Sequence, residues 1–431
     1  MEDKVAAYLE IAGKTCLLTV DKDTTLSGQC TDIPMGTYSY TLKYRNLDTR
    51  AILATAEGTI TLEPGKNTEI SFPPLVPYPF EAVTYYKVGE GPTALALGDL
   101  NNDGIPDVVT ANRGANSVSV LLGKDNGTLN EARDYSMGPG APVQHYPDGV
   151  ALGDLNGDKN LDVVVISSDP NSNYAGNLAV FLGNGDGTLK DAVFYAIGDQ
   201  PVSVAMGDLD GDGLQDVVTA NYGSEDITIL LGSKSNQLQM KGSYKLGKVN
   251  SVALGDLNGD GHLDVIASII FSQGVVVLLG NGDGTFQTPL AYTTGMINSM
   301  ALGDVNKDNN LDLIVSIYAS QNVAVFLGKG DGTFQTGQFY TAGKSPESIA
   351  LGDLDLDRNL DIVTENSGDE VVVALPGNGD GTFKTANFYE LGNSPASEPL
   401  SIALEDLNID GRPDVFSTNY DKGAVAVLIH R

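Results

Sequence analysis

The sequence predicts an all-β protein in which a small β-sandwich precedes a seven-bladed β-propeller. The first observation behind this prediction is a frame that recurs seven times: Ala-Leu-Gly-Asp, with Met206 for Leu in the third repeat and Glu405 for Gly in the seventh, then a short acidic loop, then a β-rich run. The first aspartates of successive loops are 55, 54, 48, 48, 49 and 53 residues apart. The second observation is that 51 of the 431 residues are glycine, which indicates many tight turns. A period near fifty residues with four short strands per repeat is typical of a propeller blade.

The fourth repeat illustrates one blade. Residues 251–257 are a predicted inner strand whose small side chains suit the crowded hub. The apolar runs 264–270 and 274–280 are predicted middle strands that pack between blades, and the polar run 285–295 is the outer strand. In every repeat a Phe or Leu of the outer strand is followed six residues later by Tyr. This strict period favours blade-to-blade packing for the tyrosines over a ligand-stacking role.

The two ends of the propeller are predicted to meet in one blade. The last repeat stops after a third strand, at 424–431, whereas residues 80–89 supply a spare outer strand. Pairing these two segments closes the ring and removes both free sheet edges.

Two domains follow from this arrangement. Residues 1–76 read as alternating strands of a small β-sandwich of the immunoglobulin or fibronectin kind, and residues 77–431 form the propeller. Cys16 and Cys30 are either a disulfide or two buried thiols, and the sequence leaves both possibilities open.

Each of the seven acidic loops places oxygen-bearing side chains at positions 1, 3, 5 and 9, and position 7 can add a backbone carbonyl. The predicted ligands, loop by loop, are Asp99, Asn101, Asp103, Ile105 and Asp107; Asp154, Asn156, Asp158, Asn160 and Asp162; Asp208, Asp210, Asp212, Leu214 and Asp216; Asp256, Asn258, Asp260, His262 and Asp264; Asp304, Asn306, Asp308, Asn310 and Asp312; Asp353, Asp355, Asp357, Asn359 and Asp361; Asp406, Asn408, Asp410, Arg412 and Asp414. Hard oxygen donors in a flexible loop suit Ca²⁺ better than Mg²⁺, and without thiolate or imidazole ligands they do not suit zinc. The loops are therefore predicted to hold up to seven calcium ions.

The loops are not expected to be equal. Position 6 is glycine in loops 1, 3, 4 and 7, which eases the turn, but it is Lys159 in loop 2, Asn309 in loop 5 and Arg358 in loop 6. Lys and Arg adopt a positive φ poorly and bring positive charge. Loops 2 and 6 are expected to bind calcium most weakly, unless Asn160 and Asn359 take over the turn.

With these loops, and with turns such as FLGNGDGT (181–188) and LLGNGDGTF (278–286), the chain resembles the FG-GAP or VCBS repeat family, the propeller type of integrin α chains. The resemblance covers about residues 79–431. It implies calcium on one face, in loops that join first and second strands, and ligands on the opposite face or between blades. Two departures are the segment 232–238, which lacks the glycine turn, and Glu405, which replaces the glycine before loop 7.

The composition limits the classes of partner and of chemical activity that are expected. The net charge is −31, from 56 Asp and Glu against 25 Lys and Arg, which argues against nucleic acid or an anionic membrane as partner. No run of about 18 apolar residues is present, so direct membrane insertion is not expected. The three histidines are dispersed, and Glu365 and Glu405 are isolated carboxylates, so no enzyme is expected.

The expected function is a non-enzymatic, calcium-stabilised binding or adhesion module that recognises a protein or a glycan through the face opposite the loops. Candidate contact residues stand at matching second-strand ends: Asn112, Arg113, Asn221, Tyr222, Tyr318, Asn366, Asn419 and Tyr420. The alternatives are a structural subunit that self-assembles through the N-terminal domain, and, less favoured, a polysaccharide-acting enzyme with a hub site. The need for abundant calcium favours an extracellular or cell-surface location, with a leader removed from the chain.

Overall fold

A computed structural model describes residues 80–138, 145–270, 274–317, 321–368, 371–391 and 400–431, together with the backbone of six strands nearer the N-terminus. The chain divides into two compact units, Met1–Val83 with Leu428–Arg431, and Thr84–Val427. The described residues are β-strands, turns and one short 3₁₀ helix, η1 (Pro170–Ser172). Within them, no helix has the length and apolar character needed to cross a membrane.

The N-terminal strands form one antiparallel sheet of six strands, in the order β3-β2-β1-β4-β5-β6. Their bounds are β1 Val5–Ile11, β2 Lys14–Val20, β3 Leu26–Ser27, β4 Gly36–Asn46, β5 Ile52–Leu62 and β6 Val76–Pro77. A sandwich needs two facing sheets, and the strands described in this segment make one, so the sandwich itself stays a prediction. The side chains of Cys16 and Cys30 lie outside the described residues.

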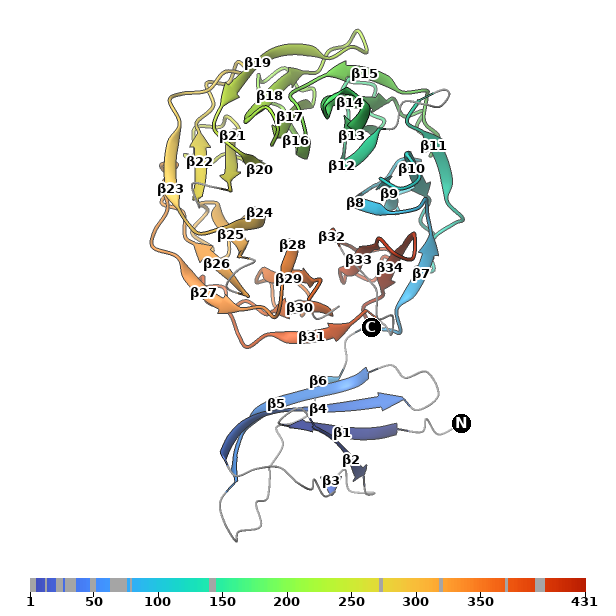
Figure 1. Ribbon diagram of the computed structural model, residues 1–431, viewed down its shortest axis with the longest axis vertical. Helices are drawn as coiled ribbons and strands as arrows, with labels where there is room; N and C mark the ends of the chain where they lie inside the picture. Colours follow the sequence, from blue (N-terminus) through green and yellow to red (C-terminus); the bar gives the residue numbers. More distant parts are fainter. Residues whose placement is uncertain are drawn as a thin grey trace. The chain divides into compact units, whose positions relative to one another are not determined.

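Seven four-stranded antiparallel sheets follow, and they confirm the predicted seven-bladed propeller (Figure 1). From the inner to the outer strand, the blades are: blade 1, β8 Pro92–Gly98, β9 Asp107–Asn112, β10 Ser117–Leu121 and β11 Arg133–Ser136; blade 2, β12 Tyr146–Gly153, β13 Asp162–Asp169, β14 Ala175–Phe181 and β15 Val193–Ala196; blade 3, β16 Pro201–Gly207, β17 Asp216–Asn221, β18 Asp226–Leu231 and β19 Gln239–Lys245; blade 4, β20 Val249–Gly255, β21 Asp264–Ile269, β22 Gly274–Leu278 and β23 Leu290–Thr293; blade 5, β24 Ile297–Gly303, β25 Asp312–Ile317, β26 Asn322–Phe326 and β27 Gln338–Thr341; blade 6, β28 Pro346–Gly352, β29 Asp361–Asn366, β30 Val371–Leu375 and β31 Asn387–Glu390; blade 7, β32 Ile402–Glu405, β33 Asp414–Asn419, β34 Ala424–Leu428 and β7 Thr84–Lys87.

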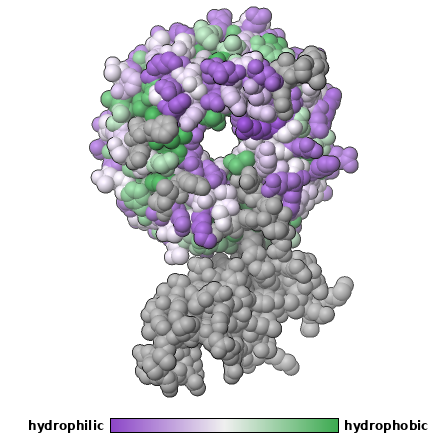
Figure 2. Space-filling view, viewed as in Figure 1, coloured by the Kyte–Doolittle hydropathy of each residue, from purple (hydrophilic) through white to green (hydrophobic). Residues whose placement is uncertain are grey.

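The inner strands stand around a central opening, which Figure 2 shows as a hole through the ring. Each inner strand contacts the next one, and β32 of blade 7 contacts β8 of blade 1, so the ring is closed. In blade 7 the outer strand β7 comes from the start of the propeller and pairs with β34 from its end, with Tyr86 opposite Val425. One blade is therefore built from two segments that lie more than three hundred residues apart in the sequence.

The apolar core lies between successive blades. Every residue of the middle strands β9 and β10 is buried. Val109 and Val118 of blade 1 share one apolar cluster with Val163 and Phe181 of blade 2. Because each blade packs both faces of its middle strands against neighbouring blades, burial in these strands does not alternate from residue to residue.

The outer-strand tyrosines confirm the packing interpretation. In β11, β15, β23 and β27 the tyrosine is the only residue that is not exposed. The hydroxyl oxygen of Tyr135 accepts a hydrogen bond from the N–H of Leu189 in the next blade at 3.1 Å. Tyr244 accepts the N–H of Phe286 at 3.2 Å and also packs edge-to-face on its ring, with centroids 5.6 Å apart. The tyrosines therefore join each blade to the next.

The glycine that ends an inner strand leaves room for the next blade. A Cβ on Gly255 would lie 2.6 Å from Cδ1 of Leu311 and 3.0 Å from Cδ1 of Leu302. We expect Gly255→Ala to lower the free energy of unfolding by about 1–3 kcal/mol, because overpacking displaces these leucines. The measurement is chemical denaturation, with Gly242→Ala as the matched control, since a Cβ there meets nothing within 4 Å. Equal costs for the two variants would contradict this packing argument.

Candidate metal-binding loops

The seven acidic loops share one compact hydrogen-bonded conformation. In loop 4, Oδ2 of Asp256 at position 1 accepts the N–H of Gly261 at 2.8 Å. Oδ1 of Asn258 accepts the N–H of Asp260 at 2.9 Å, and Oδ1 of Asp260 accepts the N–H of His262 at 2.9 Å. The bond from position 6 to position 1 recurs in all seven loops. The oxygen side chains therefore fold back over their own loop and face one another.

Two residues in each loop, not one, adopt a positive φ. Position 6 was expected to do so, and Lys159 (φ 69°) and Arg358 (φ 67°) take this conformation themselves. Asn160 and Asn359 do not take over the turn, because neither has a positive φ, so the weaker calcium binding of loops 2 and 6 stays a prediction. The sequence interpretation also missed position 4, where the residues with positive φ are Asn102, Gly157, Gly211, Gly259, Lys307, Leu356 and Ile409.

Ile409 is the most strained of these residues, because a β-branched side chain rarely tolerates a φ of 57°. Its side chain is 58% exposed, so its removal forfeits little burial. We expect Ile409→Gly to raise the free energy of unfolding by about 1 kcal/mol, the released strain less the added chain entropy of glycine. Thermal denaturation checks this, with Ile409→Val, which keeps the β-branch, expected to show no gain. If the glycine variant is less stable than the valine variant, the claim that Ile409 strains the backbone is wrong.

The position-9 aspartates are buried, at most 1% exposed in every loop. In loop 5, Oδ2 of Asp312 accepts the N–H of Val305 at 2.9 Å, and Oδ1 accepts the N–H of Gly328 at 2.8 Å. Burial raises the pKa of Asp312 to about 6, the two N–H bonds oppose this, and the charges of Asp308 and Asp304 add to it. Besides its predicted ligand role, this carboxylate therefore ties the loop to the hairpin between the third and fourth strands.

Carboxylates converge most closely in loops 3 and 6, where position 3 is Asp. Oxygen atoms of Asp208, Asp210 and Asp216 lie within 4.8 Å of one another, and those of Asp353, Asp355 and Asp361 do the same. In loops with asparagine at position 3, its Nδ2 instead donates to the position-5 carboxylate, as Asn258 does to Asp260 at 3.0 Å. Three carboxylates at this separation repel one another strongly, and their hard oxygen donors fit a divalent cation such as Ca²⁺.

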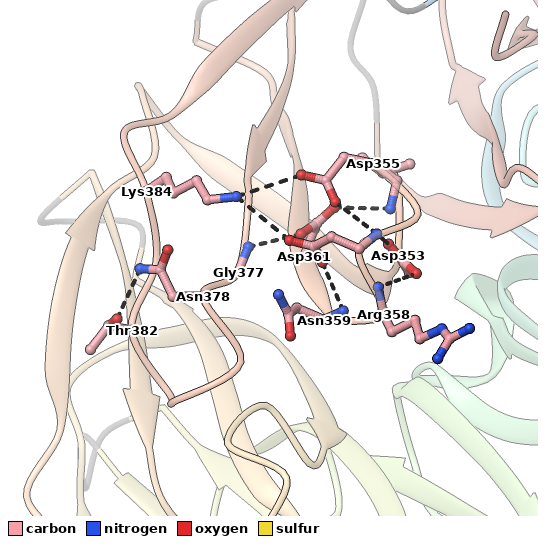
Figure 3. A network of polar contacts seen from close by, with 11 residues as sticks. Asp353, Asp355, Arg358, Asn359, Asp361, Gly377, Asn378, Thr382 and Lys384 are labelled. Carbon is pink, nitrogen blue, oxygen red and sulfur yellow. Dashed lines mark hydrogen bonds and ion pairs between the residues drawn. The ribbon is translucent and has the colours of Figure 1, made fainter.

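The carboxylates of loop 6 also lie near an amine from another part of the blade, which the sequence interpretation did not anticipate. Nζ of Lys384 lies 3.6 Å from Oδ2 of Asp355 and 3.6 Å from Oδ2 of Asp357 (Figure 3). Lys384 comes from the outer hairpin of blade 6, more than twenty residues along the chain. Its position beside the loop depends on how the strands of blade 6 pair, and the sequence alone does not show this pairing in enough detail.

Position-7 side chains lie beside the hairpin turn of their own blade. A Cβ on Gly282 would lie 2.4 Å from Nδ1 of His262, and one on Gly185 would lie 2.2 Å from Oδ1 of Asn160. The imidazole of His262 therefore packs on the turn, which agrees with the expectation that only its backbone carbonyl is available to a metal.

Loops 1 to 5 also form a backbone hydrogen bond with the following blade. The carbonyl of Leu209, at position 2 of loop 3, accepts the N–H of Gly284 in the blade 4 hairpin at 3.0 Å. Gly332 donates in the same way to Leu257, and Gly381 to Val305, at 3.0 and 3.1 Å. The conformation of a loop is therefore coupled to the contact between two blades.

The structure does not support the prediction that the second-strand asparagines contact a ligand. Asn112, Asn221 and Asn366 are 0% exposed, and Asn419 is 3% exposed. The Asn112 amide donates to Oγ of Ser119 at 2.8 Å and accepts from Thr110 at 2.8 Å. Asn221 is likewise bonded inside its own blade, to Asp226 and Thr228, and Asn419 accepts the N–H of Lys422. The Asn366 amide donates instead to the carbonyl of Ala342, which follows β27 of blade 5.

Arg113 and Tyr222, at the same strand ends, do reach the surface and pair with the next blade. Arg113 lies 3.1 Å from Asp148 and stacks over the Tyr146 ring, 4.9 Å from its centroid. In the Tyr222 pair the aromatic ring is on the earlier blade and the cation on the next one: Nζ of Lys248 lies 4.5 Å from the centroid of the Tyr222 ring.

Tyr420 and Tyr318 are the other two predicted contact residues at the strand ends, and the structure describes the first of them. The Tyr420 ring lies close to Gly91, where a Cβ would be 3.0 Å from Cε2. Tyr318 lies outside the described residues.

The ring of four-stranded sheets and its repeated acidic loops define an acidic-loop repeat propeller, a scaffold for binding or assembly. The FG-GAP-like repeat model matches at 99–165, 154–219, 208–267, 256–315 and 304–364. These matches cover more than half of the chain, and the protein belongs to the FG-GAP-like repeat family.

Solved structures with low sequence identity share the fold. BBS1N, crystallised in complex with ARL6DN and soaked with mercury, has 10% identity and a TM-score of 0.53, over 81% of this chain and 98% of that chain. The lead-soaked crystal of the same complex gives a TM-score of 0.54 at 10% identity, over 80% and 94%. A putative 6-phosphogluconolactonase from Bacteroides uniformis has 14% identity and a TM-score of 0.51, over 90% and 97%. At these identities the likeness concerns the fold alone.

Proposed function

We propose that this protein is a non-enzymatic, calcium-stabilised binding module. The observation that carries the proposal is the convergence of three carboxylates in loop 3 (Asp208, Asp210, Asp216) and in loop 6 (Asp353, Asp355, Asp361), with oxygens within 4.8 Å. Calcium bound there neutralises the repulsion and stabilises the loop, which in loop 3 also bonds to the next blade. Loops 3 and 6 have the most complete carboxylate sets. The five others combine three carboxylates with an asparagine oxygen.

The proposed binding surface is the face opposite the loops, where second strands end and inner strands begin. With the asparagines buried, the partly exposed groups described at these strand ends include the pairs Arg113–Tyr146 and Tyr222–Lys248, with the Arg113 side chain 42% exposed. Aromatic rings with adjacent polar groups suit a glycan or a polar peptide. BBS1N, a fold relative, was crystallised with ARL6DN, which supports the use of such a ring to carry a protein partner.

The experiment that tests this function has two arms. Isothermal titration with CaCl₂ measures metal binding, and a glycan and surface-protein binding screen is run with calcium and again with EGTA. The proposal expects a ligand that binds in calcium and is lost by the double variant Arg113→Ala, Tyr222→Ala. Calcium binding without any such ligand would favour the structural-subunit alternative, which full-length and propeller-only self-association then tests. Absence of calcium binding overturns the proposal.

The proposed calcium dependence favours an extracellular or cell-surface setting. Detection of the native protein in the medium or on intact cells checks this location, and its restriction to the cell interior contradicts it.

Lys384 is expected to weaken calcium binding at loop 6. Its ammonium lies 3.6 Å from two of the carboxylates, so an entering cation must displace it. We expect Lys384→Met to increase the calcium affinity of loop 6 about tenfold, equivalent to the loss of an opposing interaction of about 1.4 kcal/mol. Lys190→Met is the matched control, because Lys190 follows Leu189 as Lys384 follows Phe383. Site-resolved occupancy in crystals at graded calcium concentrations measures the effect, and an unchanged loop 6 would contradict it.

A further inference from the structure

Glu365 breaks the pattern of its blade position. It is the fifth residue of β29, where the other blades have small or neutral side chains. The equivalent residues are Ala111, Ile166, Ala220, Ser268, Ser316 and Thr418. Among the fifth residues of the seven second strands, all of them described, Glu365 is the one with a carboxyl group.

The surroundings of Glu365 connect blade 6 to blade 7 across what we term the 6–7 seam, the contact between β29 and β33. Glu365 is 0% exposed, and its Oε1 accepts a hydrogen bond from the hydroxyl of Ser417 in β33. Its Oε2 is buried and has no hydrogen-bond partner. Glu365 is also four residues along β29 from Asp361, the last predicted ligand of loop 6. At about 3.3 Å per residue, this separation puts its carboxyl group beyond the reach of a metal bound in that loop.

The charge that faces Glu365 is negative. Glu347 of β28 lies close enough to raise the pKa of Glu365, although burial is the larger cause and the Ser417 bond opposes both. Glu347 is itself held by Nδ2 of Asn298 at 3.3 Å and by the hydroxyl of Ser367 at 2.9 Å. The register partners of Glu365 in its own sheet, Ser348 and Val372, are uncharged. In the described parts of the chain, no basic side chain pairs with Glu365.

An ionised carboxylate here would be buried, half unpaired and beside another carboxylate, which is strongly unfavourable. A neutral carboxylic acid removes this cost and keeps the link to Ser417. We propose that Glu365 binds a proton that holds blades 6 and 7 together, and that loss of this proton at alkaline pH loosens the 6–7 seam.

The direction of the pH effect follows from linkage. The folded state holds the Glu365 proton more tightly than the unfolded state does, so the stabilisation is complete below the unfolded pKa. It decreases as the pH rises towards the raised pKa of the folded state, and each unit of difference changes the folding equilibrium tenfold.

The test compares the full-length protein with Glu365→Gln, which keeps the shape of the side chain and carries no charge at any pH. Chemical denaturation is measured from pH 5 to pH 9 in saturating CaCl₂, so that the acidic loops stay filled. We expect the ratio of folding constants, variant over wild type, to grow at least about tenfold over this range. Glu131→Gln, at an exposed carboxylate of blade 1, should leave the ratio constant.

A local readout distinguishes the seam from general stability. At pH 9, hydrogen exchange in peptides that contain β29 and β33 should be faster in the wild type than in Glu365→Gln, with no difference in blade 3. If Glu365→Gln fails to fold, Glu365→Ser, which places the blade 4 and blade 5 residue there, serves in the same comparison. A ratio independent of pH overturns the proposal. So does stabilisation of the wild type at pH 9 by added Na⁺ that is absent from the variant, since a cation would then occupy the seam.

Discussion

Asp312→Ala is expected to lower the free energy of unfolding by about 2–6 kcal/mol, even in metal-free buffer. The substitution leaves the N–H groups of Val305 and Gly328 buried without an acceptor, and each such donor costs about 1–3 kcal/mol. The measurement is chemical denaturation in EGTA, which removes any contribution from bound metal.

Asp331→Ala in the same blade is the matched control. Its carboxylate also accepts two hydrogen bonds, from the N–H of Thr333 at 2.9 Å and from its hydroxyl at 2.6 Å, but it is exposed. Water replaces those bonds, so the expected cost is below about 1 kcal/mol. If the two variants lose equal stability, the structural role of Asp312 as a buried acceptor is wrong.

Chelation of calcium is expected to have the second large effect. A ligand present at a hundredfold excess over its Kd stabilises the folded state by about 2.7 kcal/mol per site. Occupancy of any two loops at this excess would therefore contribute about 5 kcal/mol, which corresponds to a fall in melting temperature of several degrees on addition of EGTA. Calorimetry in CaCl₂ and in EGTA measures this fall.

Specific variants and a second metal sharpen the chelation experiment. Asp208→Asn should reduce the difference in melting temperature between CaCl₂ and EGTA. Asp186→Asn, in an exposed hairpin turn, should leave this difference unchanged. MgCl₂ should stabilise the protein less than CaCl₂, because Mg²⁺ loses its water ligands reluctantly. Identical melting curves in CaCl₂ and in EGTA would eliminate calcium as a stabilising ligand.

The propeller could be predicted because each of the first six repeats contains all four strands of a blade in chain order. The repeat period, the glycine turns and the tyrosine spacing are local signals, and they determine the sheet and its neighbours. The roles of individual polar residues were harder to predict. Asn112 and Asn221 end their strands like surface residues, yet they are buried because side chains of the third strand fold over them. Only the three-dimensional pairing of the second and third strands shows this.

The acidic loops illustrate the same limit. Their oxygen side chains follow directly from the sequence, but the direction in which each oxygen points does not. The acceptor role of Asp312 depends on Gly328, which lies sixteen residues later across a hairpin, and the same spacing recurs in blades 1, 3, 4 and 6. Lys384 could not be assigned to loop 6 from sequence, because its approach depends on the register of the outer strand.

The shared seventh blade constrains how the chain folds as it is synthesised. Strand β7 leaves the ribosome early, but its pairing partner β34 follows it by more than three hundred residues. Six blades can form on the nascent chain while β7 waits with its hydrogen-bonding groups unpaired, which exposes a template for aggregation. Chains truncated within β34 should therefore retain most of their sheets and still be captured by chaperones.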